Sequence, residues 1–187
     1  MYMLENEHDL IRKAKDGDRA AFEALYEHYV EAIYRFVVLK VSSQRDAEDL
    51  THEVFLASWK NLGSYRYKGV PFSSWLYRIA RNKVIDHYRT RRDHADIEQV
   101  NPNIFVSSDS PERDADILLD VERVKQSLDR LSSDQKDVTI MRFVEELSHR
   151  EIAKALGKSE GAVRLIQHRA LKNLREFLKE SDNDHDA

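Results

Sequence analysis

Apolar residues recur at helical spacing in both halves of this chain, and the longest interruption of that spacing lies between residues 93 and 111. Before the interruption the spacing is carried by Phe22, Leu25, Tyr26, Tyr29, Ile33, Phe36 and Val37. After it the spacing is carried by Ile117, Val121, Val124, Leu128 and Leu131. Only 5 Gly and 3 Pro occur in 187 residues, which argues against a sandwich or barrel with many tight hairpins. We therefore expect an all-α protein with two small helical domains joined by a flexible acidic linker.

The interruption also sets the domain boundaries. Its turn-forming segments, 101–103 and 107–111, contain Asn, Ser and Pro, and its many acids favour an extended tether. We expect a first domain over residues 1–92, a linker over 93–115, a second domain over 116–180 and an acidic tail over 181–187.

Several classes of chemistry are excluded or disfavoured. The chain has no Cys, which rules out disulfides, thiolate nucleophiles and cysteine zinc sites. His52-Glu53 lacks the second His of the zinc motif His-Glu-x-x-His, and no Gly-rich phosphate loop or Gly-x-Ser-x-Gly elbow occurs. We expect no catalytic residues, no metal and no cofactor. The amino terminus does not resemble a signal peptide and no apolar run approaches ~18 residues, so we expect a cytoplasmic protein without membrane insertion.

Charge is strongly segregated along the chain although the net charge is only −4. Between Arg66 and Arg92 eight basic residues face one acid, Asp86, and a second basic stretch runs from Lys158 to Arg175. The local field rather than the total charge attracts phosphate, so these two blocks suggest nucleic-acid binding. The alternative is that each block is simply a solvated helix face.

The second basic block has the layout of a helix-turn-helix. Ser148 and Glu151 form a capping box that begins a short helix, Gly157 ends it, and Ser159 can cap a longer one. On the longer helix Arg164, His168, Lys172 and Arg175 share a face, with Gln167 adjoining, where they could reach a DNA major groove. An ordinary helical hairpin with a basic face is the alternative.

The first basic block forms a cationic stripe on a helix predicted over residues 72–92. Arg78, Arg81, Asn82, Arg89 and Arg92 fall within one arc, and Trp75 lies at its border. The preceding loop adds Tyr65 and Tyr67. Cations that follow a backbone and rings that stack on bases suit melted DNA. Alternatively, Trp75 belongs to the core and the arginines serve solubility.

An acidic face lies on an earlier helix, where Asp46, Asp49 and Glu53 share one side. Acids do not bind phosphate, so this face should meet solvent or a protein. Spacing alone favours solvent.

Three motifs in order resemble the bacterial extracytoplasmic-function (ECF) sigma factors. They are Asp-Ala-Glu-Asp-Leu-Thr-His-Glu-Val-Phe-Leu at 46–56, Phe-Ser-Ser-Trp-Leu-Tyr-Arg-Ile-Ala-Arg-Asn at 72–82, and the helix-turn-helix with His-Arg-Ala at 168–170. The similarity covers about residues 18–92 and 118–178. The chain departs from the family at two places. Ala162 stands where the family often has Thr, and Leu165-Ile166-Gln167 stands where it often has Ser-Arg-Leu. The −35 sequence that this chain reads is therefore left open.

The resemblance implies three sets of site residues. The first domain would be sigma region 2, binding core RNA polymerase through Asp46, Asp49, Leu50, Glu53 and Val54. It would recognise and melt the −10 element through Tyr65, Arg66, Tyr67, Lys68, Trp75, Arg78, Arg81, Asn82 and Arg89, with Asn82 a candidate for contacting a flipped base. The second domain would be sigma region 4, reading the −35 element through Ser159, Glu160, Arg164, Gln167, His168, Arg169 and Lys172.

The function that the resemblance implies is promoter-specific transcription initiation, with core RNA polymerase and promoter DNA as partners. An external inhibitor, an anti-sigma factor, is a further family-based expectation. The alternative is a helix-turn-helix repressor or response-regulator output domain that acts without polymerase. A protein-interaction adaptor with basic faces is the rival from another class.

Overall fold

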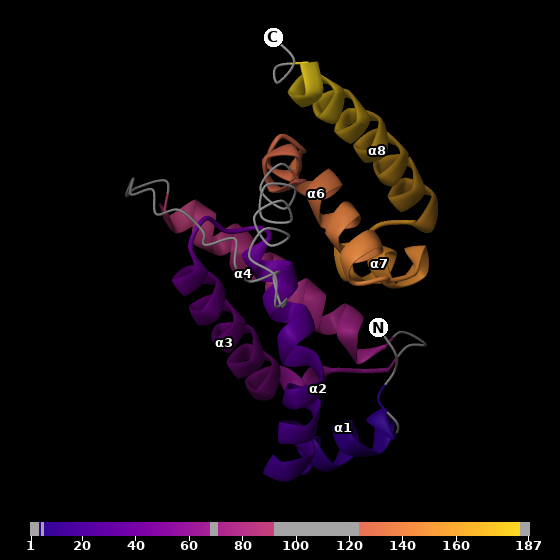
Figure 1. The fold of residues 1–187 in the computed structure, drawn as a ribbon. Coiled ribbons are helices and arrows are strands. Elements are labelled where there is room, and N and C mark those ends of the chain that lie inside the picture. The colour runs from indigo at the N-terminus through magenta and orange to yellow at the C-terminus, as the bar shows by residue number, and fades with distance from the viewer. Residues whose placement is uncertain (1–3, 5, 68–70, 92–123, 184–187) are drawn as a thin grey trace, which may run out of the picture.

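The computed structural model describes residue 4 and residues 6–67, 71–91 and 124–183, which form two groups of helices (Figure 1). The first group contains α1 (Glu7–Lys15), α2 (Arg19–Val38), α3 (Gln44–Asn61), the 3₁₀ turn η1 (Leu62–Ser64) and α4 (Phe72–Arg91). The second contains a helical turn over 124–129, α6 (Ser133–Thr139), the π-helical turn η3 (Ile140–Val144), α7 (His149–Leu156) and α8 (Glu160–Asn183). The described residues contain no strand, which confirms the all-α prediction. The expected linker over 93–115 lies outside the described residues.

Side-chain caps begin two helices of the first group. The Asp18 side chain accepts a hydrogen bond from the backbone N–H of Ala21 at 3.2 Å, at the start of α2. The Ser43 hydroxyl accepts one from the N–H of Asp46 at 3.3 Å, at the start of α3. Each cap pairs an amide that the helix itself leaves free.

The helix-turn-helix is present as predicted. The Ser148 and Glu151 side chains each accept from the other's backbone N–H, which forms the capping box of α7. Gly157 ends α7 at φ 66°, a left-handed conformation that glycine adopts without steric penalty. The Ser159 hydroxyl then accepts from the N–H of Ala162 at 3.1 Å and so caps α8.

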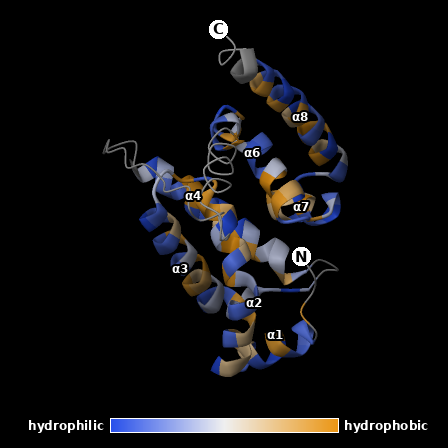
Figure 2. Cartoon of the chain, in the orientation of Figure 1, coloured by the Kyte–Doolittle hydropathy of each residue, from blue (hydrophilic) through white to orange (hydrophobic). Residues whose placement is uncertain are grey.

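Buried apolar side chains of both groups form one hydrophobic cluster. The first group encloses fully buried side chains that include Leu25, Ile33, Phe36 and Leu76, and the second encloses Ile140, Met141, Ile152 and Val163. On α8 hydrophobic segments alternate with hydrophilic ones (Figure 2). Val163 and Ala170 of this helix are buried.

Two details differ from the sequence expectation. Val124 belongs to a predicted apolar stripe, but 52% of its surface is exposed, whereas Leu128 and Leu131 on the same stripe are buried. The helix α8 continues to Asn183, so the first three residues of the predicted tail are helical.

The two groups of helices pack against one another. The helix α7 lies against α4, and the turn η3 lies against α2 (Figure 1). None of the described helices is long and apolar enough to cross a membrane.

Candidate nucleic-acid interface

The helix α4 presents a row of polar and cationic side chains beside a small pocket. Arg78, Asn82 and Arg89 are exposed along it. Arg78 and Asn82 line a pocket of about 270 Å³ together with the half-buried ring of Trp75, between the end of α3 and the middle of α4. An amide, a guanidinium and an indole around one hollow suit an unpaired base, which offers hydrogen-bonding edges and a flat face.

The segment before α4 is fixed by an aromatic cluster rather than left free. The Tyr65 ring is buried, with its centroid 5.3 Å from that of Phe72 and 5.2 Å from that of Trp75. Its carbonyl accepts a hydrogen bond from Lys15 Nζ at 2.6 Å, and burial raises the pKa of the Tyr65 hydroxyl. The buried Tyr65 ring therefore packs against Trp75 and holds it in place. The sequence had not suggested this role for Tyr65.

The neighbours of Tyr65 are more accessible. Tyr67 is 50% exposed, and its ring stands edge-on to His8 of α1. The Arg66 guanidinium is exposed and donates to the carbonyl of Gly63 at 2.7 Å. Lys68, the last predicted residue of this segment, lies outside the described residues.

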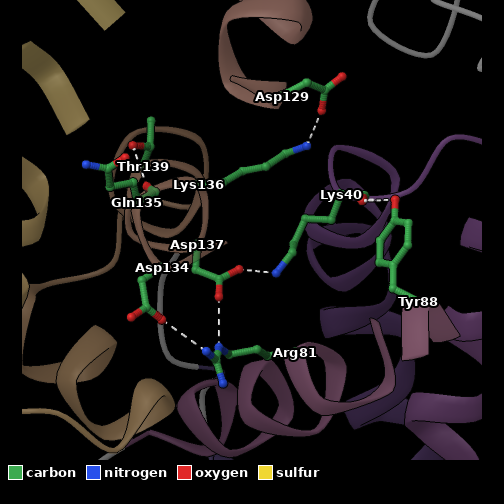
Figure 3. A network of polar contacts seen from close by, with 9 residues as sticks. All are labelled: Lys40, Arg81, Tyr88, Asp129, Asp134, Gln135, Lys136, Asp137 and Thr139. Carbon is green, nitrogen blue, oxygen red and sulfur yellow. Dashed lines mark hydrogen bonds and ion pairs between the residues drawn. The ribbon is translucent and has the colours of Figure 1, made fainter. Parts of the chain in front are cut away.

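Arg81 differs from the other cations of α4 because its guanidinium is engaged by the second group of helices. Its Nε donates to Asp137 at 2.8 Å and its Nη2 to Asp134 at 3.0 Å, both on α6 (Figure 3). The structure thus brings Arg78, Asn82 and Trp75 together at one pocket and directs Arg81 elsewhere.

The acidic face of α3 is only partly as predicted. Asp49 and Glu53 are exposed, Asp46 is half-buried, and Leu50 and Val54 are buried in the core. Their burial means that Leu50 and Val54 hold α3 against its neighbours and do not offer surface to a partner.

The same face carries an apolar residue that sequence reasoning missed. Leu56 follows Glu53 by three positions, so both lie on one side of α3, and 45% of its surface is exposed. The signal was a leucine at helical spacing from the two acids. Glu53 itself pairs with Lys83 of α4 at 2.8 Å.

The outer face of α8 carries the cations predicted for the helix-turn-helix. Its exposed side chains include Arg164, His168, Arg169 and Lys172. Gln167 is half-buried, with Oε1 2.6 Å from Nε2 of His149, so it links the two helices of the motif. Glu160 lies 3.7 Å from Arg164 and is exposed, as is the capping residue Ser159.

No metal centre emerges from the part of the chain that the structure describes. No group of three or more His, Asp or Glu side chains there could hold an ion. What the site offers is binding surface: cations and amides on α4 and α8, and acids beside an apolar side chain on α3.

Comparison with known protein families gives two matches, in the order that the two groups of helices follow. The Sigma-70 region 2 family model matches residues 25–94, and the Sigma-70, region 4 model matches residues 127–176. The first runs from within α2 through α4, and the second covers α6 to most of α8.

Two curated relatives align along most of the chain. The ECF RNA polymerase sigma factor BldN of Streptomyces coelicolor is 34% identical over 173 residues, covering 91% of this chain and 65% of BldN. The ECF RNA polymerase sigma factor SigD of Mycobacterium tuberculosis is 35% identical over 174 residues, covering 90% of this chain and 82% of SigD. The chain thus spans just under two thirds of the length of BldN.

A solved structure has the same fold. The sigma factor RpoE of Bartonella quintana, crystallised in complex with the anti-sigma factor NepR, superimposes with a TM-score of 0.68 at 25% identity. The superposition covers 84% of this chain and 96% of that one.

Proposed function

The chain belongs to the ECF RNA polymerase sigma factors, and from that membership we propose that it binds core RNA polymerase and directs initiation at specific promoters. One observation carries the proposal: the chain has two surfaces suited to DNA, on separate groups of helices. They are α4 with its pocket and α8 of the helix-turn-helix. A helix-turn-helix repressor would need only the surface on α8, and its function would not explain the surface on α4.

The first domain, residues 1–92, is proposed to act at the −10 element. Trp75, Arg78 and Asn82 surround the pocket of about 270 Å³, so a base taken out of the duplex would enter there. Arg66, Tyr67 and Arg89 would contact the adjoining strand, and Tyr65 would fix Trp75 rather than touch DNA. Stacking and phosphate contacts together offset the few kcal/mol that unstacking a base costs.

The second domain, residues 116–180, is proposed to read the −35 element with α8. Arg164 and Gln167 would contact base edges, whereas Lys172 and Arg169 would contact phosphates. His149 holds Gln167 at 2.6 Å and so fixes the direction of that amide. The segment 93–115 is proposed as the tether between the two DNA contacts.

The exposed face of α3 is the proposed contact with polymerase. Asp49 and Glu53 would supply charge and Leu56 an apolar anchor, because protein interfaces combine a buried apolar centre with a polar rim. Leu50 and Val54 would serve this surface only indirectly, by holding α3 in place.

Regulation and location follow from the same role. The structure of RpoE with NepR supports an anti-sigma factor as a further partner of this chain. We propose that the protein acts by binding rather than by catalysis, and that it works in the cytoplasm, where polymerase is.

The proposal is tested by mixing the purified protein with core polymerase and genomic DNA. We expect co-elution with polymerase and transcripts from discrete start sites. Tight, salt-sensitive binding to duplex DNA without co-elution would instead establish a repressor.

A further inference from the structure

Three carboxylates of the second domain face cations of the first. Asp137 of α6 is fully buried, and both described partners of its side chain come from the other domain: Lys40, which follows α2, and Arg81 of α4 (Figure 3). The second carboxylate of this cluster, Asp134, joins Arg81 to Lys158 of the helix-turn-helix through contacts of 3.0 Å and 2.9 Å.

A second cluster lies beside η3. Glu145 is 2% exposed, and its two oxygens accept a forked pair of hydrogen bonds from Arg35 of α2 at 3.2 Å and 3.1 Å. The hydroxyl of Tyr77 in α4 donates to it at 3.0 Å. As with Asp137, every described polar partner of this side chain belongs to the first domain.

The partners of these carboxylates indicate that the side chains serve contacts between the two domains. A carboxylate buried inside its own domain needs hydrogen bonds there, since an unpaired buried charge is strongly unfavourable. Among the residues that the structure describes, Asp137 and Glu145 have none within their own domain. We infer that they are surface acids of the second domain, which become buried when it docks on the first.

Docking also covers part of the proposed −10 surface. Arg81 donates to Asp137 and Asp134 through Nε and Nη2, which are the donors that a guanidinium uses to bind a phosphate. Lys154 of α7 lines a pocket of about 320 Å³ together with Trp75 and Arg78, so α7 lies over the beginning of α4.

We propose that Asp137 and Glu145 form an intramolecular lock, through which the second domain closes on the first and withdraws Arg81 from promoter DNA. The inhibitory part of this proposal rests on the proposed function, because it takes Arg81 as a DNA contact. The lock is suited to reversal: burial lowers the pKa of Lys40 even beside Asp137, and a buried ion pair gains little over its lost hydration. DNA phosphates and polymerase would then compete with the carboxylates and separate the domains.

The test compares Asp137→Asn with Asp129→Asn in the full chain. Both changes remove one negative charge near α6, but Asp129 pairs with Lys136 of its own domain, at 2.5 Å. Because the chain has no Cys, spin labels can be placed on Glu27→Cys in α2 and Lys179→Cys in α8, both at exposed positions. Glu145→Gln provides a second opening variant, and circular dichroism checks the helix content of each.

We expect one narrow inter-label distance distribution in the parent protein and in Asp129→Asn, and a broad, longer one in Asp137→Asn and Glu145→Gln. Affinity for a promoter fragment at fixed salt should rise at least about tenfold in the opened variants, as the fraction of binding-competent protein rises. A broad distribution in the parent, or an unchanged narrow one in both variants, would refute the lock. Opening without tighter DNA binding would refute its inhibitory role, while loss of polymerase co-elution in the parent would refute the proposed function alone.

Discussion

The hydroxyl of Tyr77 in α4 donates a 3.0 Å hydrogen bond to Glu145, which lies 68 residues further along the chain. Neither side chain reaches solvent appreciably. A tyrosine of α4 is thus tied to the second group of helices, and we expect its pKa to depend on whether the two groups are packed together.

Replacing Tyr77 with Phe should change how stability depends on alkaline pH. Burial, and after it Glu145, raises the pKa of Tyr77 above its ordinary value. The pKa of this hydroxyl is higher in the folded chain than in the unfolded chain, where it is about 10, so the unfolded chain releases the proton first. The stability that the protonated hydroxyl contributes is therefore complete below pH ~10 and is lost as the pH rises above it.

The measurement is the free energy of unfolding in urea between pH 8 and pH 11. Above pH ~10 the parent should lose up to about 1.4 kcal/mol per pH unit more than Tyr77→Phe does. At pH 8 the variant should be about 0.5–1.5 kcal/mol less stable because one hydrogen bond is lost. Tyr29 and Tyr65, whose pKa values burial also raises, are present in both proteins, so equal slopes would mean that Tyr77 is not buried in solution.

Reversing the charges on α3 should abolish polymerase binding without unfolding the chain. In Asp49→Lys with Glu53→Lys, two acids of the proposed interface become cations and the pair between Glu53 and Lys83 is lost. That pair is partly exposed to solvent, so the loss of stability should stay below about 1 kcal/mol. Co-elution with core polymerase is the measurement.

A matched control applies the same charge change away from α3. Asp16 and Glu23 are exposed near the junction of α1 and α2, and their replacement by Lys should leave co-elution intact. Retained binding in the α3 variant would remove that face from the interface.

Sequence periodicity and capping residues predicted the helices well because those signals are local. Ser148 begins a helix and Gly157 ends it, both as expected. Each effect acts within four residues of the chain, so no knowledge of tertiary structure is needed.

The burial of individual site residues was less predictable. Tyr65 lies in a segment without periodicity, so nothing in the sequence distinguished a buried ring from an exposed one. The contacts of Arg81 with Asp137 and of Arg35 with Glu145 span 56 and 110 residues. They depend on how two domains dock, which helix patterns cannot encode.

Replacing Asn82 with Ala should weaken binding of single-stranded −10 DNA. Its amide lines the pocket with Trp75 and Arg78, and a lost amide-to-base contact is worth about 1–3 kcal/mol. Fluorescence anisotropy with a labelled oligonucleotide measures the change. Thr90→Ala, an exposed change near the end of the same helix, serves as the control, and equal affinities for the two variants would exclude Asn82 from base recognition.

Replacing Arg164 and Gln167 with Ala should alter −35 preference more than −10 preference. Both side chains belong to α8, and Gln167 is oriented by His149 at 2.6 Å, so its amide is positioned before DNA arrives. A base contact discriminates by about 1–3 kcal/mol, so promoters that differ in the −35 element should become more alike in affinity. Competition between such promoters, with polymerase present, measures the change.

Lys172→Ala separates base reading from phosphate binding on the same helix. Its side chain is exposed, and its contact with Glu176 is long, at 4.0 Å. The ammonium is therefore available to a phosphate. Affinity should fall alike for all −35 sequences, and the slope of log affinity against log salt should decrease by about one. If Arg164→Ala and Gln167→Ala behave in this uniform way too, α8 binds the DNA backbone through this face and the bases are read by another.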